Sequence, residues 1–382
     1  MNIIKKSLIT MLIVTMFIIT TGFISNRNES NVFSENEIAE AEKTVIPENY
    51  MQLISNAKIL GINAGNLSSM RIGKAFTITR LENKDMEPTK DIIYYPVIFE
   101  KNIVALITLI KSNNELCCTV GIDFANNLND IVQKVGLENN PCLFSYDNSI
   151  YAIDKNNNIY NVFTDQQSQK MVNNPGYDRI RSYSNYISYN NYITIDDIQN
   201  NNYVDNVELK AENIHLLPIY PQKNQYINGS QRPVCWAATV ASMVHFEMKP
   251  QYNNLTAKDV CDSHGHPYTS ELDANIPSYL NYYLPDIYAP TYMLRALSGD
   301  EIKTVINNID PAFMSSNCGI AKCHATALIG YIALESGTVS NIYIMDPATE
   351  NYKICTRYNN KYVFALGNDS YTWNRTVRLL YH

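Results

Sequence analysis

Two segments with alternating apolar residues near the C-terminus constrain the fold more than any other feature of the chain. Residues 323–335 read CHATALIGYIALE and residues 337–347 read GTVSNIYIMDP, with a Ser-Gly turn between them. Alternating apolar residues around such a turn predict an antiparallel β-hairpin. The open ends of that hairpin bring His324, at the start of the first strand, close to Asp346, at the end of the second.

A helix is predicted ahead of this hairpin. Residues 235–247 read CWAATVASMVHFE, with small and apolar residues at helical spacing. Pro233 suits the first turn, where its missing N–H would be unpaired anyway. Ser230 is the expected N-cap, and Pro250 ends the helix.

The chain divides into parts of different composition. Residues 362–367 and 372–382 add β-patterned segments, so residues 207–382 are predicted to form an α+β domain with the helix first and an antiparallel sheet after it. Residues 51–165 also combine strand and helix patterns, and they contain no histidine. Residues 166–206, rich in Asn, Tyr and Asp, are predicted to be a linker or an extended covering segment.

The N-terminus has the features of a secretory signal. In residues 1–25, two lysines precede an uncharged apolar run from Leu8 to Ile24, and polar residues follow. We expect a secreted protein, and the length of the run leaves a retained membrane anchor as the alternative. Residues 26–50, polar and acidic, are predicted to be flexible.

Charge and cysteine content narrow the partners and the redox state. The net charge is −7 and no long basic run is present, so nucleic acid is not an expected partner. Eight cysteines in an exported chain predict disulfides, although spacing alone does not give their pairing. For Cys318 and Cys323 a disulfide is expected rather than a metal site, with two free thiols as the alternative. A rival interpretation draws a zinc tetrad from residues 261–266 and 318–324, although their spacings match no standard zinc finger.

The position of Cys235 indicates a nucleophile. A thiolate is favoured at a helix N-terminus and beside an imidazolium. His324 is the candidate base, and Asp346 is placed to accept a hydrogen bond from its second nitrogen and fix the ring. His245 lies about 15 Å further along the same helix and is too remote. The alternative for Cys235 is a buried structural thiol, and Trp236 is expected in the core.

The motifs Gln-x-x-x-Cys-Trp-Ala-Ala, with Gln231 and Cys235, then His324 before an apolar strand, then Asp346-Pro347, resemble the papain-like cysteine peptidases. The nearest resemblance is to bacterial secreted members of the staphopain and bacteriocin-processing kind, and it covers about residues 207–382. It implies a helix that carries the Cys, a sheet that carries the His, and an Asp that orients the His. No cofactor is implied.

The resemblance also implies a glutamine that helps to hold the oxyanion of the reaction. In the family this glutamine is usually further from the Cys than Gln231 is from Cys235, and Gly229 stands at the expected place. Gln231 is therefore the first candidate, and Gln225 and Gln222 are the alternatives.

The N-terminal half acquires a role from the same resemblance. Secreted peptidases of this family are commonly made as zymogens, so residues 51–165 are predicted to be a propeptide that inhibits the catalytic domain in the same chain. Cleavage is then expected within residues 165–210, with Arg179, Arg181 and Lys210 as candidate processing points.

Two other functions remain open from the sequence. A transglutaminase or glutamine deamidase uses the same Cys-His-Asp logic and would transfer an acyl group to an amine or release ammonia. A secreted binding protein with a degenerate peptidase fold would carry an unreactive Cys235. Peptide or protein substrates are the expected partners of an active enzyme.

Overall fold

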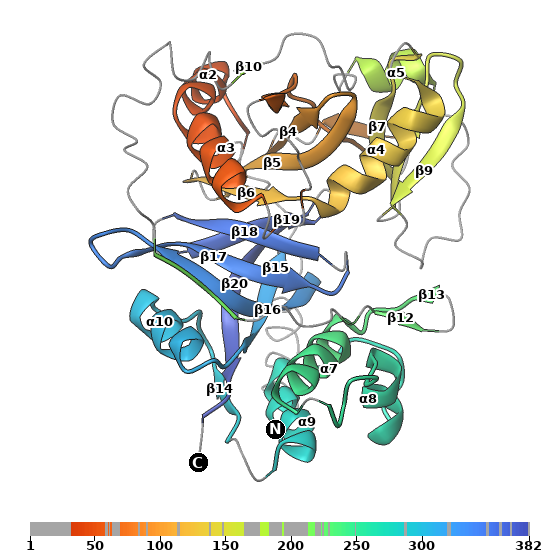
Figure 1. The fold of residues 1–382 in the computed structure, drawn as a ribbon. Helices are drawn as coiled ribbons and strands as arrows, with labels where there is room; N and C mark the ends of the chain where they lie inside the picture. Colours follow the sequence, from red (N-terminus) through yellow and green to blue (C-terminus); the bar gives the residue numbers. More distant parts are fainter. Residues whose placement is uncertain are drawn as a thin grey trace, which may run out of the picture.

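The computed structural model shows a mixed α+β chain whose two halves share a 13-stranded sheet, beside a 5-stranded and a 2-stranded sheet (Figure 1). The structure describes residues 32–57, 60, 62, 69–82, 85–88, 91–112, 115–136, 139–146, 149–163, 176–182, 193–194, 213–217, 223, 225–227, 230–248, 250–285, 289–318, 322–348, 351–358, 361–366 and 369–380. The apolar run from Leu8 to Ile24 lies outside these residues. Among the residues described, no helix is long and apolar enough to cross a bilayer.

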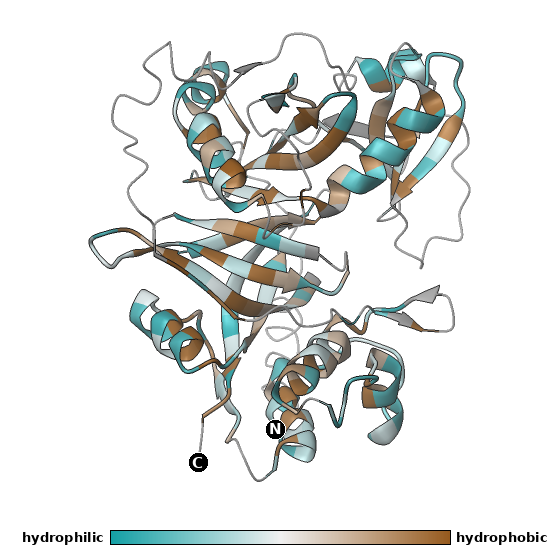
Figure 2. Cartoon of the chain, viewed as in Figure 1, coloured by the Kyte–Doolittle hydropathy of each residue, from teal (hydrophilic) through white to brown (hydrophobic). Residues whose placement is uncertain are grey.

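The first half contributes the outer strands of the main sheet. Its elements are α2 (Glu35–Lys43), α3 (Val45–Asn56), β1 (Arg71–Ile72), β4 (Ile92–Phe99), β5 (Asn102–Ser112), β6 (Glu115–Gly121) and β10 (Ile193–Thr194). Strand β5 pairs antiparallel with β4 and β6, and β1 links β4 to β10. The strands β4 and β5 are apolar along most of their length (Figure 2). Continuous burial explains this pattern, because a strand covered on both faces has no polar side to alternate with.

A second sheet completes the first half. Its elements are β2 (Thr79–Glu82), β3 (Asp85–Pro88), α4 (Asp123–Val135), β7 (Cys142–Tyr146), β8 (Ser149–Ile153), β9 (Ile159–Phe163) and α5 (Tyr177–Arg181). The strands run in the order β3-β2-β7-β8-β9. The helix α4 is apolar on one face, and Leu128, Ile131 and Val132 share a buried cluster with residues of β4 and β5. The helix α4 thus covers one side of the strands predicted from the sequence.

The second half is built around a closed antiparallel barrel of six strands. These are β15 (Ala312–Cys318), β16 (Lys322–Ala333), β17 (Val339–Asp346), β18 (Asn351–Tyr358), β19 (Lys361–Leu366) and β20 (Asp369–Arg378). Each strand pairs with the next, and β20 pairs back with β15. The predicted hairpin of residues 323–346 is confirmed as β16 and β17. Strand β19 covers only the end of β18, and β6 of the first half pairs with β18 at Lys353–Cys355, so the barrel relies on the first half to cover that edge.

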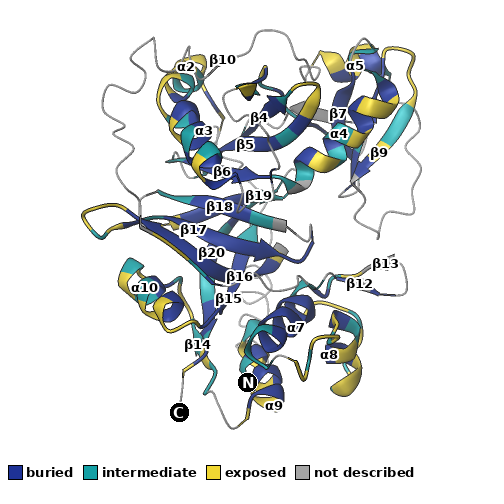
Figure 3. Ribbon diagram, in the orientation of Figure 1, coloured by how far each residue is buried: buried dark blue, intermediate teal, exposed yellow. Residues whose placement is uncertain are grey.

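Helices and short strands surround the barrel. They are β11 (Asn213–Leu216), β12 (Tyr226–Ile227), β13 (Ser230–Gln231), α7 (Cys235–Glu247), α8 (Ala257–Ser263), the 3₁₀ turn η4 (Asp273–Asn275), α9 (Ile276–Tyr283), β14 (Thr291–Met293) and α10 (Gly299–Asn307). The helix α7 has the predicted bounds, and it is buried over Trp236–His245 (Figure 3). Strand β11 lies against β16 at Gly330, where a Cβ atom would meet the carbonyl oxygen of His215 at 2.6 Å.

The two halves are joined by strand pairing and by buried hydrogen bonds. Strand β6 of the first half pairs with β18 of the barrel, with Gly121 opposite Lys353. From α3, Asn56 accepts a hydrogen bond at 2.5 Å from the hydroxyl of Tyr343 in β17. A single apolar cluster contains residues of α2, α3, β4, β5, α7, β16 and β17. Much of the core is therefore common to both halves.

Several local predictions are wrong. Residues 26–50 were predicted to be flexible, but α2 and the first half of α3 lie there, and Ser34 and Glu37 form a capping box that begins α2. Within residues 166–206, predicted to be a linker or an extended covering segment, α5 packs Tyr177 and Ile180 against the second sheet, as a covering segment would. Ser230 lies in β13, and the residue before the helix is Val234, which makes no side-chain cap.

The processing candidates and the disulfide also differ from expectation. Arg179 and Arg181 are exposed but lie within α5, and Lys210 lies outside the described residues. All eight cysteines are thiols, so the expected Cys318–Cys323 disulfide does not form. The register of the β15–β16 hairpin places Cys323 opposite Asn317, and its thiol donates to the Asn317 side-chain oxygen at 3.3 Å.

A candidate Cys-His-Asp site

Cys235 is the first residue of α7 and is partly exposed. The helix that carries it is lined with small residues, and Ala237, Ala238 and Ala241 are fully buried. Small side chains allow α7 to lie close to β15 and β16, which it contacts. The first turn of α7 contains no acidic residue, so the unpaired N–H groups and the positive end of the helix dipole face the thiol without a competing carboxylate.

His324 and Asp346 meet at the open end of the β16–β17 hairpin, as the sequence predicts. The His324 Nε2 lies 2.7 Å from the Asp346 Oδ1. His324 is 5% exposed and Asp346 is fully buried. The bond leaves the Nδ1 atom of the ring on the side away from the carboxylate.

Asp346 is held by more than His324. Its Oδ1 also accepts a hydrogen bond from the backbone N–H of Ala348 at 2.9 Å, and its Oδ2 lies 2.7 Å from the Lys353 Nζ. Burial raises the pKa of Asp346, but the charges of Lys353 and His324 and their hydrogen bonds outweigh burial and hold that pKa well below its usual range. The carboxylate is therefore ionised at neutral pH.

The surroundings of His324 link it to Cys235. Burial lowers the pKa of His324, but the charge and hydrogen bond of Asp346 and a hydrogen bond with the Cys235 thiol raise it, and the net shift is upward. Since Nε2 is bonded to Asp346, Nδ1 is the ring atom that faces the thiol. The structure thus brings together Cys235, His324 and Asp346.

Aromatic side chains enclose the imidazole. The ring centroids of Phe364 and Tyr371 lie 6.2 Å and 5.7 Å from that of His324. Burial raises the pKa of Tyr371 far above its ordinary value, so its hydroxyl stays neutral. These rings exclude water from the His324–Asp346 pair and strengthen the electrostatic interactions there.

The three candidate glutamines are placed differently. Gln231 is in β13, but its side chain lies outside the described part of the structure, as does Gln222. Gln225 is 7% exposed, and its backbone carbonyl accepts a hydrogen bond at 3.0 Å from the backbone N–H of Arg232. The β12–β13 hairpin therefore folds the chain back and brings Gln225 beside the residues that lead into α7.

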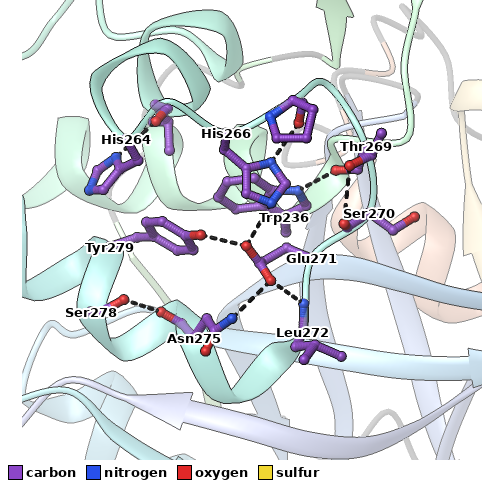
Figure 4. A network of polar contacts seen from close by, with 12 residues as sticks. Trp236, His264, His266, Thr269, Ser270, Glu271, Leu272, Asn275, Ser278 and Tyr279 are labelled. Atoms are coloured by element: carbon purple, nitrogen blue, oxygen red, sulfur yellow. Dashed lines mark hydrogen bonds and ion pairs between the residues drawn. The ribbon is translucent and has the colours of Figure 1, made fainter.

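A polar network around Glu271 lies beside Trp236 of α7, and the sequence did not predict it (Figure 4). The Glu271 carboxylate accepts from the N–H of Leu272 at 2.6 Å, from the Asn275 side chain at 3.0 Å and from the Tyr279 hydroxyl, and it pairs with His266 at 2.8 Å. Burial raises the pKa of Glu271, but these hydrogen bonds and the His266 charge lower it by more, so the net shift of the pKa is downward. The net effect is a stable carboxylate.

The same network fixes the tryptophan next to the thiol. The Trp236 ring packs against His266 and Tyr279 at centroid distances of 5.0 Å and 4.8 Å, and its N–H donates to the Thr269 carbonyl at 2.9 Å. The sequence signal for this network was that Glu271 and His266 flank a segment without a periodic apolar pattern, which indicates a polar loop. Only the tertiary fold, however, places that segment beside Trp236.

A second contact joins the helical side to the barrel near the thiol. Asp273 of η4 accepts hydrogen bonds from Arg375 at 2.8 Å and from Ser315 at 2.9 Å. Burial raises the pKa of the exposed Cys323 thiol, and the charges of Asp273, Arg375 and Cys235 also act on it. Asp273 and Arg375 therefore border the region of Cys235 and His324.

The rival zinc site is not assembled. Among the described residues, no group of three or more His, Cys, Asp or Glu side chains could hold a metal ion. The Nδ1 of His264 instead donates to the backbone carbonyl of Val260 at 2.9 Å, and Cys261 is buried. Of the other histidines, His215 stacks on Tyr331 and His245 is buried in α7.

Neither a scan of known protein families nor a comparison with curated proteins finds a match for this chain.

Proposed function

We propose that the chain is a secreted cysteine endopeptidase of papain-like architecture, made as a zymogen. The observation that carries the proposal is the contact of His324 with both the thiol of Cys235 and the buried carboxylate of Asp346. Cys235 stands at a helix N-terminus, and the two partners come from a β-hairpin, which is the arrangement that the sequence resemblance implies. The predicted signal in residues 1–25 supports export.

The proposed reaction uses each group in a defined role. The Cys235 sulfur attacks the carbonyl carbon of the scissile peptide bond, with its proton held by His324 Nδ1. The imidazolium then gives that proton to the leaving amine as the C–N bond breaks, and a thioester remains on Cys235. Water attacks the thioester, His324 takes its proton, and the acid leaves as the thiol is restored. Asp346 keeps the ring oriented throughout.

The oxyanion that forms on the carbonyl needs hydrogen-bond donors. The N–H of Cys235 is unpaired within the helix and is one donor. For the side-chain amide we propose Gln225 rather than Gln231, because Gln225 is buried and the β12–β13 hairpin returns it to the start of α7. Loss of one such donor reduces turnover by about 10²–10³-fold in acyl transfer. Gln225→Ala and Gln231→Ala, compared for turnover with equal folding, distinguish the two.

The zymogen part of the proposal rests on the order of the two halves and on the resemblance. Cleavage within residues 165–210 would separate a His-free half from the half that contains the site. Arg179 and Arg181 are poor cleavage points, since Ile180 between them is fully buried. A cut there would require α5 to unfold first.

Intact mass of the exported chain tests the proposal. Wild type and Cys235→Ala are incubated with a mild reductant, with Cys323→Ala as the control that removes the neighbouring exposed thiol. Conversion of wild type and Cys323→Ala, but not of Cys235→Ala, to a fragment that begins within residues 165–210 supports a self-processing peptidase. A thiol-directed epoxide should label Cys235.

Other outcomes point to the other functions. Labelling of Cys235 without peptide cleavage, together with incorporation of an amine into a glutamine-containing protein or release of ammonia, would replace the peptidase by a transglutaminase or deamidase. No labelling of Cys235 in the folded protein would refute an enzyme of this type and favour a binding protein.

A further inference from the structure

The mechanism does not by itself account for Lys353. This side chain is 4% exposed and belongs to the third residue of β18. Its ammonium lies 2.7 Å from the Asp346 Oδ2, donates to the Ala365 carbonyl at 3.4 Å and lies 5.5 Å from the centre of the Phe364 ring. A buried ammonium is retained only where such partners offset its loss of water. Its shortest polar contact is with the carboxylate that orients His324.

The charge on Asp346 gives Lys353 a consequence for the site. A neutral amide in place of Asp346 would orient the imidazole without a charge, but a bare carboxylate also stabilises the imidazolium strongly. If the imidazolium is too stable, it gives up its proton reluctantly to the leaving amine. A cation on the Oδ2 atom of the carboxylate reduces that effect while the hydrogen bonds of the Oδ1 atom with His324 and Ala348 remain.

We propose that Lys353 is a positioning residue that acts through Asp346: it fixes the carboxylate against His324 and offsets its charge, so that His324 can release its proton. This inference rests on the proposed function, because it presumes a thiol–imidazole pair that reacts. Lys353 has no contact with substrate in this scheme.

The other ionisable groups around His324 do not replace Lys353. Cys235 of α7 faces the ring directly, and Tyr371 of β20 contributes a hydroxyl that stays neutral. Cys323, next in the chain, faces Arg375 and Asp273, which pair with each other. Among the described residues, Lys353 is thus the cation besides His324 itself that is in direct contact with the Asp346 carboxylate.

The test is the pH dependence of labelling at Cys235 by an epoxysuccinate. Opening the epoxide forms a C–S bond and needs a proton for the alkoxide, which His324 supplies, so labelling falls at high pH as His324 loses its proton. The full-length chains are wild type, Lys353→Met, Asp346→Asn and Asp346→Asn/Lys353→Met. Peptide mapping separates Cys235 from Cys323.

The expected result is a pattern of signs. Lys353→Met raises the pH of the alkaline fall by about one to two pH units, because the offsetting charge is gone. Asp346→Asn lowers it, and the double variant returns it close to wild type. The control Lys361→Met removes a half-exposed lysine from neighbouring β19 and should leave the alkaline fall unmoved.

The outcomes separate the inference from the proposed function. If wild type is not labelled at Cys235, the proposed function fails and the inference falls with it. If wild type is labelled but Lys353→Met reduces labelling equally at every pH, Lys353 is only structural and the inference alone is overturned. If Lys353→Met alone does not fold, the double variant must still show a higher pH for the alkaline fall than Asp346→Asn. An unchanged pH overturns the inference.

Discussion

The contact between the two halves predicts that they unfold together, and Gln52→Ala tests this. In α3, the Gln52 amide nitrogen lies 3.4 Å from the Asn341 Oδ1, and the Asn341 amide nitrogen lies 3.0 Å from the Gln52 Oε1. Gln52 is 7% exposed and Asn341 is fully buried. Asn341 keeps a bond to Thr356 at 2.9 Å after the substitution, but its carbonyl oxygen loses its partner.

The expected loss of stability follows from that one unpaired oxygen. A buried polar group left without a partner costs about 1–3 kcal/mol, so we expect the free energy of unfolding to fall by about 2 kcal/mol. Both tryptophans of the chain, Trp236 and Trp373, belong to the second half. Tryptophan fluorescence during urea unfolding therefore reports on the half that does not carry the substitution.

The matched control is Gln133→Ala in α4. Its side-chain amide is exposed and makes only long contacts, 3.5 Å to the Lys101 carbonyl and 3.4 Å to Asn102. This variant should keep the wild-type transition. A Gln52→Ala transition that coincides with wild type in tryptophan fluorescence, while far-ultraviolet circular dichroism shows an earlier step, would mean that the halves unfold independently and would refute the reasoning.

Three further predictions concern single features. Glu271→Gln should lower the free energy of unfolding by about 2 kcal/mol at neutral pH, because the hydrogen bonds of Glu271 are made to a charged carboxylate. The pKa of Glu271 is lowered on folding, so the wild-type advantage is present above about pH 4.5 and is lost as pH falls through the folded-state pKa. Urea unfolding at a series of pH values measures this. Ile309→Gly should raise the melting temperature, since Ile309 has φ 68° and is 58% exposed, and a β-branched residue at this φ is strained by about 1–2 kcal/mol. Ile309→Ala keeps a Cβ atom and its strain, so its melting temperature should not rise as far. Titration with a disulfide reagent should find only Cys235, Cys318 and Cys323 in the native chain and all eight thiols in denaturant; rapid reaction of more than three would contradict the burial.

The elements that bear the site could be predicted because their signals are local. The β-patterned runs in residues 323–346 and the Ser-Gly turn between them predict a hairpin from neighbouring residues alone, and both strands are buried along nearly their whole length. The turn then fixes His324 close to Asp346. The helix that begins at Cys235 was predictable for the same reason, since its small residues recur at helical spacing and a proline stands just before it.

The wrong predictions depended on contacts between distant segments. Residues 35–50 appear polar, yet Ile46 and Tyr50 are fully buried because α3 packs on strands of both halves. Composition alone does not reveal such sparse apolar positions. The Cys318–Cys323 pairing failed because register, rather than proximity in sequence, determines which residues lie opposite each other in a hairpin. Lys353 gave no clear signal, since a lysine in a strand is usually solvated.

The continuity of the main sheet bears on how the proposed zymogen would be activated. Strand β6 of the first half is hydrogen-bonded to β18, and Gly121 stands opposite Lys353. Departure of the first half would leave the backbone of β18 as an open edge at the residue that holds Asp346, and an open edge invites water or a new strand. It would also uncover Asn341 and Tyr343, whose polar groups are paired with α3. Cleavage of the linker alone removes none of these contacts, so loss of the first half requires a separate step that rebuilds the surroundings of Lys353.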